Sequence, residues 1–129
     1  MQIAILGAGA MGSVVGGYLA AAGNSVTLID INDDFVTAIN SRGLILESEG
    51  TQRVVDIRAA TNSTNLQPVD LIVVLVKSFH TEEAIKGCLN LLGPKTMVLS
   101  LQNGLGHEEV LAKIVGKEKV IAGKTYIGG

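Results

Sequence analysis

The sequence predicts one α/β domain in which strands and helices alternate to build a doubly wound parallel sheet. Short apolar runs at residues 2–6, 25–29, 69–76, 96–101 and 119–122 are separated by segments of helical length. The run at 69–76 reads VDLIVVLV and is the most continuously apolar stretch. Such a run is typical of a central parallel strand covered by helices on both faces. A chain of 129 residues suits a single domain, which we assign to residues 1–129.

The first half of the chain predicts a βαβα unit followed by a hairpin. Strands are expected at residues 2–6 and 25–29, with helices at 10–22 and 33–42. Gly23-Asn24 and Gly43 follow these helices as end signals. Residues 44–57 form two strand-like pieces around the polar residues 48–51, which predicts a hairpin inserted after the second helix.

The second half continues the alternation of strands and helices. Residues 60–68 are expected to form a polar loop before the strand at 69–76. A helix over residues 80–92 should end at Gly93-Pro94, followed by a strand at 96–101, a helix at 108–115 and a strand at 119–122. Helical crossovers between parallel strands give a doubly wound sheet, whose ligands bind beyond the carboxyl ends of the strands.

Composition and charge argue against several classes of function. A net charge of -2 with no run of Lys or Arg leaves no basic surface for nucleic acid. No segment approaches the roughly 18 apolar residues of a membrane span, and no leader is recognisable, so we expect a cytoplasmic protein with no membrane partner. The single Cys88 is expected to be a buried small hydrophobe. His80 and His107 have no clustered carboxylate or cysteine, so no metal site is predicted.

A glycine motif follows the first strand and opens the first helix, the context that makes this pattern specific for a dinucleotide. The first glycine permits the tight turn, the second removes a side chain where pyrophosphate approaches, and the third lets the helix pack closely on the strand. The amide groups of the helix N-terminus favour the negatively charged pyrophosphate. The motif comprises Gly7, Ala8, Gly9, Ala10, Met11 and Gly12, all of which we assign to the cofactor site.

Asp30 ends the second strand, 18 residues beyond Gly12. An acidic residue about 20 positions after the glycine motif is the expected partner of the adenosine ribose hydroxyls. Asp30 could instead cap the following helix, but Asn32 or Asp33 can cap it equally well and would leave Asp30 free at the strand end. We therefore assign Asp30 to the ribose, in a Rossmann fold that binds NAD(P)H.

Three further segments, VLVKSFHT, SLQNGLGHEEVL and AGKTYIGG, together with the N-terminal GAGAMGS, resemble ketopantoate reductases (2-dehydropantoate 2-reductases) along the whole chain. The resemblance implies that Lys77 contacts the cofactor and that Asn103 lies near the nicotinamide ribose and the substrate. It also implies that the backbone of Gly129 meets the nicotinamide side. Taken singly, Lys77 could be the first solvated residue after a strand, and Asn103-Gly104 could be only a turn.

Members of that family reduce the 2-keto group of 2-dehydropantoate in pantothenate and coenzyme A synthesis. The resemblance implies that the catalytic acid is a lysine in a helical C-terminal domain that also binds most of the small 2-keto acid substrate. This chain contains no such domain, so we assign it no catalytic residue and expect it to be inactive alone. Many members prefer NADPH and carry an Arg after the second strand. Asp30 here favours NADH, although Lys77 could compensate.

Two other functions remain open from the sequence. The chain could be the cofactor domain of another hydroxyacid dehydrogenase, which would share this half and differ in its substrate domain. It could also be a regulatory NAD-sensing Rossmann module, a class that reaches a similar length. Lys77 and the segment Gln102-Asn103-Gly104 argue against the sensor, since a sensor has no substrate to orient beside the nicotinamide.

Overall fold

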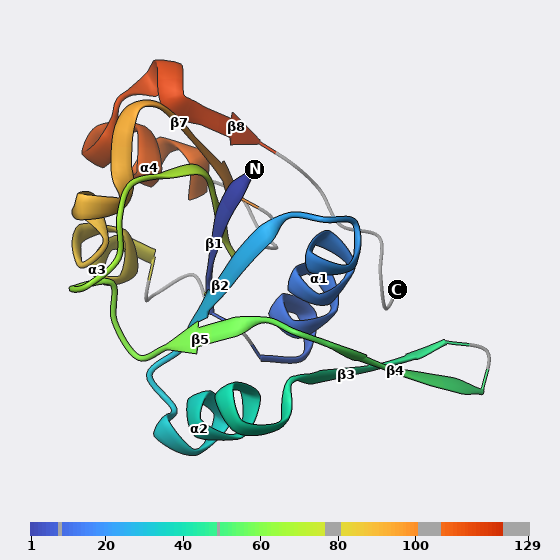
Figure 1. Ribbon diagram of the computed structural model, residues 1–129. Coiled ribbons are helices and arrows are strands. Elements are labelled where there is room, and N and C mark those ends of the chain that lie inside the picture. Colours follow the sequence, from blue (N-terminus) through green and yellow to red (C-terminus); the bar gives the residue numbers. More distant parts are fainter. Residues whose placement is uncertain (8, 49, 77–80, 101–106, 123–129) are drawn as a thin grey trace.

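The computed structural model describes residues 1–7, 9–48, 50–76, 81–100 and 107–122. Within these ranges the chain forms a six-stranded sheet in the order β5-β2-β1-β6-β7-β8, with every neighbouring pair parallel (Figure 1). The predicted doubly wound sheet is therefore confirmed. No helix in the described ranges is long and apolar enough to cross a membrane. The strands of this sheet are β1 (Gln2–Leu6), β2 (Ser25–Ile29), β5 (Arg58–Ala60), β6 (Val69–Val74), β7 (Leu92–Ser100) and β8 (Val120–Ala122).

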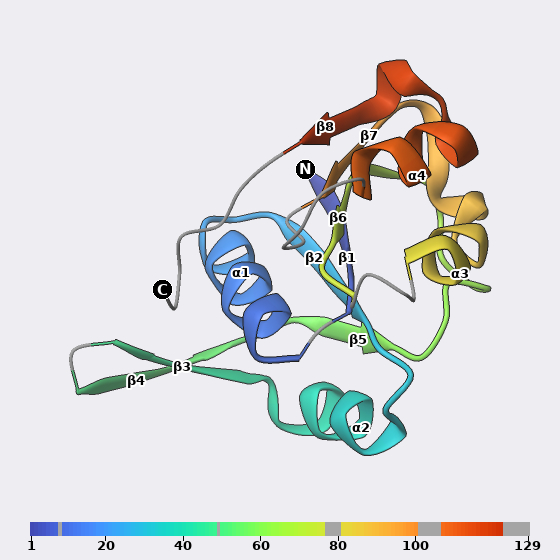
Figure 2. The same cartoon turned by 180° about the vertical axis from the view of Figure 1, so that it is seen from behind.

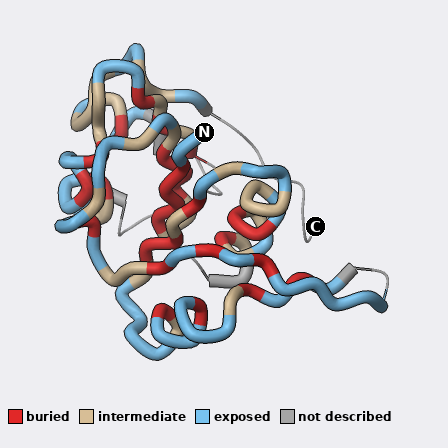
Figure 3. The backbone as a smooth tube through the Cα atoms, viewed as in Figure 1, coloured by how far each residue is buried: buried red, intermediate tan, exposed pale blue. Residues whose placement is uncertain are grey.

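Helices cover both faces of the sheet, as the apolar β6 predicted (Figures 1 and 2). Side chains alternate between the faces along a strand, and β1 shows this directly. Ile3 and Ile5 pack in a core with side chains of α1 (Gly9–Ala21) and α2 (Asp33–Arg42). Ala4 and Leu6 pack in a second core with side chains of α3 (Thr81–Lys86) and α4 (His107–Val115). The central strands are thus covered on both sides, and their residues are largely buried, as the red segments of the tube in Figure 3 show.

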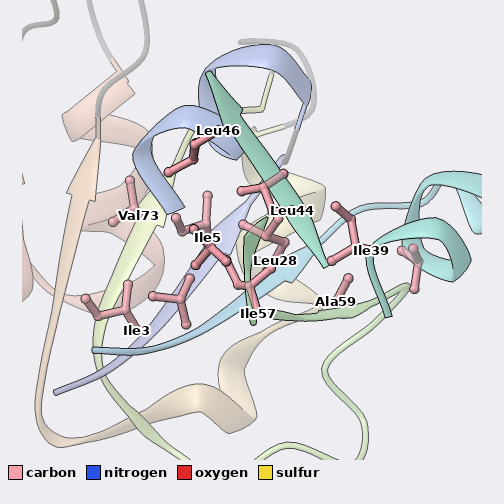
Figure 4. Packing of buried hydrophobic residues seen from close by; sticks show 12 residues of the cluster. Ile3, Ile5, Leu28, Ile39, Leu44, Leu46, Ile57, Ala59 and Val73 are labelled. Carbon is pink, nitrogen blue, oxygen red and sulfur yellow. The ribbon is translucent and has the colours of Figure 1, made fainter. Parts of the chain in front are cut away.

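The predicted hairpin is present as β3 (Leu44–Ser48) and β4 (Thr51–Val55), and it projects from the body of the domain (Figures 1 and 2). Its two strands form a separate antiparallel sheet. Leu44 and Leu46 turn inward from β3 toward the core that contains Leu28 and Ile5 (Figure 4). The hairpin therefore extends the hydrophobic core on the α1 side of the sheet.

Strand β5 was not predicted: residues 58 and 59 were assigned to no element, and residue 60 was taken as the start of a polar loop. It forms the edge of the sheet and pairs in parallel with β2, with Leu28 opposite Ala59 and Ile29 opposite Ala60. A strand of three residues is too short to show an alternating pattern of its own. Its position depends on contacts with β2 and α2, which lie elsewhere in the sequence.

The helix predicted over residues 80–92 is wrong in its second half. Helix α3 ends at Lys86, a 3₁₀ turn follows at Leu89–Leu91, and β7 begins at Leu92 and runs through Gly93-Pro94. The β6–β7 register shifts here, and proline is tolerated at such an irregularity. Thr96 and Lys119 stabilise the irregular stretch: the Thr96 hydroxyl accepts a hydrogen bond from the Gly93 amide at 2.8 Å, and Lys119 Nζ donates to the Gly93 carbonyl at 3.0 Å.

Candidate functional site

The proposed site lies where β1, β2 and β6 end at one edge of the sheet. Leu6 pairs with Ile29 at the last position of the β1–β2 register. The Gly7 amide then donates to the Ile29 carbonyl at 2.9 Å, and the Leu75 amide donates to the Leu6 carbonyl at 2.9 Å. The glycine motif and Asp30 therefore follow the ends of two neighbouring strands at the same edge of the sheet, as the sequence predicted.

Gly7 makes the turn between β1 and α1. Its φ of 88° lies in the left-handed region that favours glycine. A Cβ atom on Gly7 would lie 2.8 Å from both the amide nitrogen and Cγ1 of Val76, which follows β6. The residue is therefore constrained twice, by its backbone conformation and by the chain leaving β6, and the predicted tight turn is confirmed.

Gly12 brings α1 close to the preceding loop and to β1. A Cβ atom on Gly12 would lie 2.5 Å from the Gly7 carbonyl oxygen and 3.5 Å from Cγ2 of Ile5. The close packing predicted for the third glycine is confirmed, and the nearest obstacle is the loop backbone itself. Helix α1 begins at Gly9, so Ala10 and Met11 belong to its first turn, whereas Ala8 lies outside the described residues.

Two further glycines of α1 pack closely against neighbouring elements, and the sequence analysis did not assign them a role. A Cβ atom on Gly16 would lie 2.7 Å from Cδ2 of Leu28 in β2. A Cβ atom on Gly17 would lie 2.7 Å from Cδ2 of Leu46 in the hairpin. Helix α1 is thus held between the sheet and the hairpin. The available signal was the absence of charged residues from all 13 residues of α1, which indicates a helix with neighbours on more than one side.

Asp30 is fixed at the end of β2 by its own backbone and side chain. Its amide donates to the carbonyl of Ala60 in β5 at 3.0 Å. Its Oδ1 accepts a hydrogen bond from the amide of Asn32 at 2.9 Å, and Asn32 Oδ1 accepts from the amide of Phe35 at 3.0 Å. Asn32 is therefore the N-cap of α2, as one of the two alternatives predicted. The expectation that this would leave Asp30 free is wrong, because an aspartate at a strand end readily bonds the backbone two residues on.

This local bond is compatible with binding a ribose. An ionised carboxylate has two oxygens and about four acceptor sites, so one backbone contact does not exhaust its capacity. Asp33 and Asp34 occupy the first turn of α2, where acidic side chains stabilise the helix dipole. The three carboxylates gather negative charge around the end of β2, which disfavours a further phosphate there.

The remaining assigned residues, Lys77, Asn103 and Gly129, lie outside the described residues. The strands that precede two of them end at the same edge as the glycine loop, since Val74 of β6 pairs with Ser100 of β7. For metal binding, the described ranges contain no group of three or more His, Cys, Asp or Glu side chains that could hold an ion.

Sheet order, the glycine turn and the acidic residue after β2 define a Rossmann domain of the dinucleotide-binding class. The family model of Ketopantoate reductase PanE/ApbA matches residues 3–129. The chain therefore belongs to this family, and the resemblance drawn from its motifs is confirmed.

Relatives in sequence and in structure agree with this assignment. The chain is 43% identical over 117 residues to the 2-dehydropantoate 2-reductase of Pyrococcus horikoshii, covering 91% of this chain and 38% of that protein. It is 38% identical to the one from Halobacterium salinarum, covering 99% of this chain and 42% of that protein. A solved 2-dehydropantoate 2-reductase from Geobacter metallireducens superposes with a TM-score of 0.85 at 32% identity, covering 95% of this chain and 40% of that one.

A structure of D-mandelate dehydrogenase with NADH and anilino(oxo)acetate is also similar. Its TM-score is 0.90 at 36% identity, covering 98% of this chain and 41% of that one. The chain spans about two-fifths of the length of the relatives and solved structures it matches.

Proposed function

We propose that this chain is the cofactor-binding part of an NAD(P)H-dependent 2-dehydropantoate 2-reductase. The observation that carries the proposal is the family match over residues 3–129, which includes every segment assigned to the cofactor. A bound reduced nicotinamide would supply hydride from C4 to the carbonyl carbon of the 2-keto acid, and an acid would supply the proton to its oxygen. The products are oxidised cofactor and the 2-hydroxy acid.

Three of the described residues, Gly7, Gly12 and Asp30, have proposed roles in holding the cofactor. The turn at Gly7 and the close approach at Gly12 set the start of α1, whose amide groups and dipole attract the pyrophosphate. The Asp30 carboxylate accepts hydrogen bonds from the adenosine ribose. By resemblance, Lys77 would contact the cofactor, Asn103 would lie near the nicotinamide ribose and the substrate, and the Gly129 backbone would meet the nicotinamide side.

The preferred cofactor in this proposal is NADH. Asp30 would repel the 2′-phosphate of NADPH, with Asp33 and Asp34 adding to the unfavourable field. A like unit charge about 5 Å from a carboxylate costs about 1 kcal/mol even at the dielectric constant of water. We therefore expect NADH to bind about tenfold more tightly than NADPH at low ionic strength, and Asp30→Arg to reverse the order. The NADH complex of the similar D-mandelate dehydrogenase is in keeping with this preference.

The test is a titration of the chain with each reduced cofactor, followed by nicotinamide fluorescence or calorimetry. Saturable binding of NADH supports the proposal, and failure to bind either dinucleotide contradicts it. Tighter binding of NADPH would mean that Lys77 outweighs Asp30. Because the catalytic acid and most substrate contacts are assigned to a second domain, we expect no turnover of ketopantoate by this chain alone. Detectable, saturable turnover would refute that division of roles.

A second candidate is the cofactor domain of another 2-hydroxyacid dehydrogenase. The similarity to D-mandelate dehydrogenase favours it, because that structure matches as well as the reductases do. The two candidates share the cofactor half and differ in the substrate domain. Assaying the longest natural form of the protein with 2-dehydropantoate and with an aromatic 2-keto acid separates them by their kcat/KM ratio.

A further inference from the structure

We propose that Asn40, near the end of α2, is a positioning residue for the ribose-binding carboxylate of Asp30. The inference rests on the proposed function, because it assumes that Asp30 contacts the adenosine ribose. Asn40 lies ten residues beyond Asp30 and is exposed. Its side chain makes contacts that connect α2 to the strand beside Asp30.

The Asn40 amide binds the backbone of β5 through both of its polar atoms. Nδ2 donates to the carbonyl of Ala59 at 2.9 Å, and the Ala59 amide donates to Oδ1 at 2.9 Å. Both backbone groups of one edge-strand residue are thus paired with a single side chain, much as another strand would pair with them. The contact also blocks this edge against pairing with a foreign strand.

The next residue of β5 holds Asp30. Ala60 pairs with Ile29 in the sheet, and its carbonyl accepts the Asp30 amide at 3.0 Å. Asp30 is connected to α2 from the other side as well, because its carboxylate accepts from Asn32, which caps the helix. The contacts therefore form a closed ring: Asp30 to the start of α2, the end of α2 to β5, and β5 back to Asp30.

Asn40 completes this ring of contacts at β5, which is much shorter than α2. Strand β5 has only three residues and pairs with β2 on one side, so its free side is held by α2. Val36 and Ile39 of α2 belong to the same hydrophobic core as Ala59. Because hydrophobic contacts are non-directional, they do not fix the position of the strand along its axis. A paired donor and acceptor does fix that position, because hydrogen bonds are directional. Loss of the Asn40 side chain should let β5 and the Asp30 backbone shift together.

The experiment measures NADH affinity for Asn40→Ala, well below the melting temperature. We expect binding about fivefold weaker than in the parent, since a charged hydrogen bond to the ribose weakens as its geometry relaxes. Asn90→Ala is the matched control. Asn90 is also exposed and also bonds backbone carbonyls, those of Ser63 at 2.7 Å and Leu66 at 3.3 Å, but none of these residues belongs to the ring. The Asn90→Ala variant should have a lower free energy of unfolding than the parent, and its NADH affinity should stay within about twofold of the parent's.

A double variant separates positioning from a general loss of structure. In an Asp30→Ala background, Asn40→Ala should cause no further loss of affinity, because the group that it positions is gone. Equal losses in both backgrounds would overturn the inference, as would parental affinity in Asn40→Ala. If Asn40→Ala does not fold, Asn40→Asp retains the acceptor for the Ala59 amide and should show an intermediate loss that also vanishes in the Asp30→Ala background. A parent that binds no dinucleotide, or an Asp30→Ala variant that binds like the parent, instead contradicts the proposed function.

Discussion

Replacing Gly12 with alanine tests the geometry of the glycine motif most directly. The substitution adds one methyl group at a point where the structure places the Gly7 carbonyl oxygen 2.5 Å away. Ordinary van der Waals contact begins near 3.4 Å, so helix and loop would have to separate by about 0.9 Å. The obstacle is backbone, which cannot rotate aside as a flexible side chain can.

Two opposing effects determine how much Gly12→Ala changes the free energy of unfolding. Alanine is favoured over glycine inside a helix by about 1 kcal/mol. Overpacking in a well-packed region costs about 1–3 kcal/mol. Because the obstacle is backbone, we expect the overpacking cost to lie in the upper part of its range, at about 2–3 kcal/mol. The net loss is then about 1–2 kcal/mol, which for a domain of this size lowers Tm by roughly 4–8 °C. NADH affinity should fall as well, because the displaced parts are the loop and helix start assigned to the pyrophosphate.

The assay is denaturant unfolding combined with NADH titration. Gly87→Ala is the control, since a Cβ atom there would lie 3.4 Å from its nearest neighbour, the Glu83 carbonyl oxygen, and Gly87 is remote from the motif in sequence. That variant should be close to neutral and bind NADH normally. If Gly12→Ala proved more stable than the parent with unchanged affinity, the helix would not approach the loop as closely as we describe.

Three further changes have distinct expected outcomes. Gly9→Val should abolish most dinucleotide binding and preserve the far-UV circular dichroism, because a branched side chain would occupy the approach to the pyrophosphate; calorimetry showing parental affinity would contradict this. Gly17→Ala should cost less stability than Gly12→Ala in the same denaturation assay, since its nearest neighbours are the flexible ends of Leu46 and Leu44. Burial raises the pKa of the Cys88 thiol, so the folded state keeps this proton to higher pH than the unfolded state does. The free energy of unfolding should therefore be unaffected by this group below about pH 8.5 and should decrease above it, where the unfolded state loses the proton first. Cys88→Ala should lessen that decrease.

Local sequence signals predicted most of the elements because their determinants are close in the chain. Strands β1 and β2 and helix α2 have the bounds expected from apolar runs, and α2 has its end signals in place. Asn32 caps its start and Gly43, with φ of 77°, ends it. These features depend on residues within one turn of each other, so a single sequence contains them.

The errors arose where distant contacts decide the structure. Residues 87–94 combine helix-forming leucines with Gly93-Pro94, and local preferences favoured a longer helix. In the fold this stretch is held by the Thr96 hydroxyl and by Lys119, which lies more than 20 residues further along. Strand β5 was missed for the same reason, since its partners are β2 and the Asn40 side chain, the latter 19 residues before it.

The same distinction applies to the candidate site. Gly7, Gly12 and Asp30 could be recognised because a parallel sheet brings the carboxyl ends of β1 and β2 to one edge whatever the details of packing. The contact that holds the Asp30 backbone could not be recognised, because its partner Ala60 lies 30 residues further along. The bond from the Asn32 amide to the Asp30 carboxylate, in contrast, is local. Topology therefore predicts which residues should meet a ligand, whereas in our proposal the affinity also depends on supporting contacts such as that of Asn40. If the fivefold effect proposed for Asn40 is measured, a substitution that touches neither the ligand nor a motif will have changed cofactor binding through the edge of the sheet.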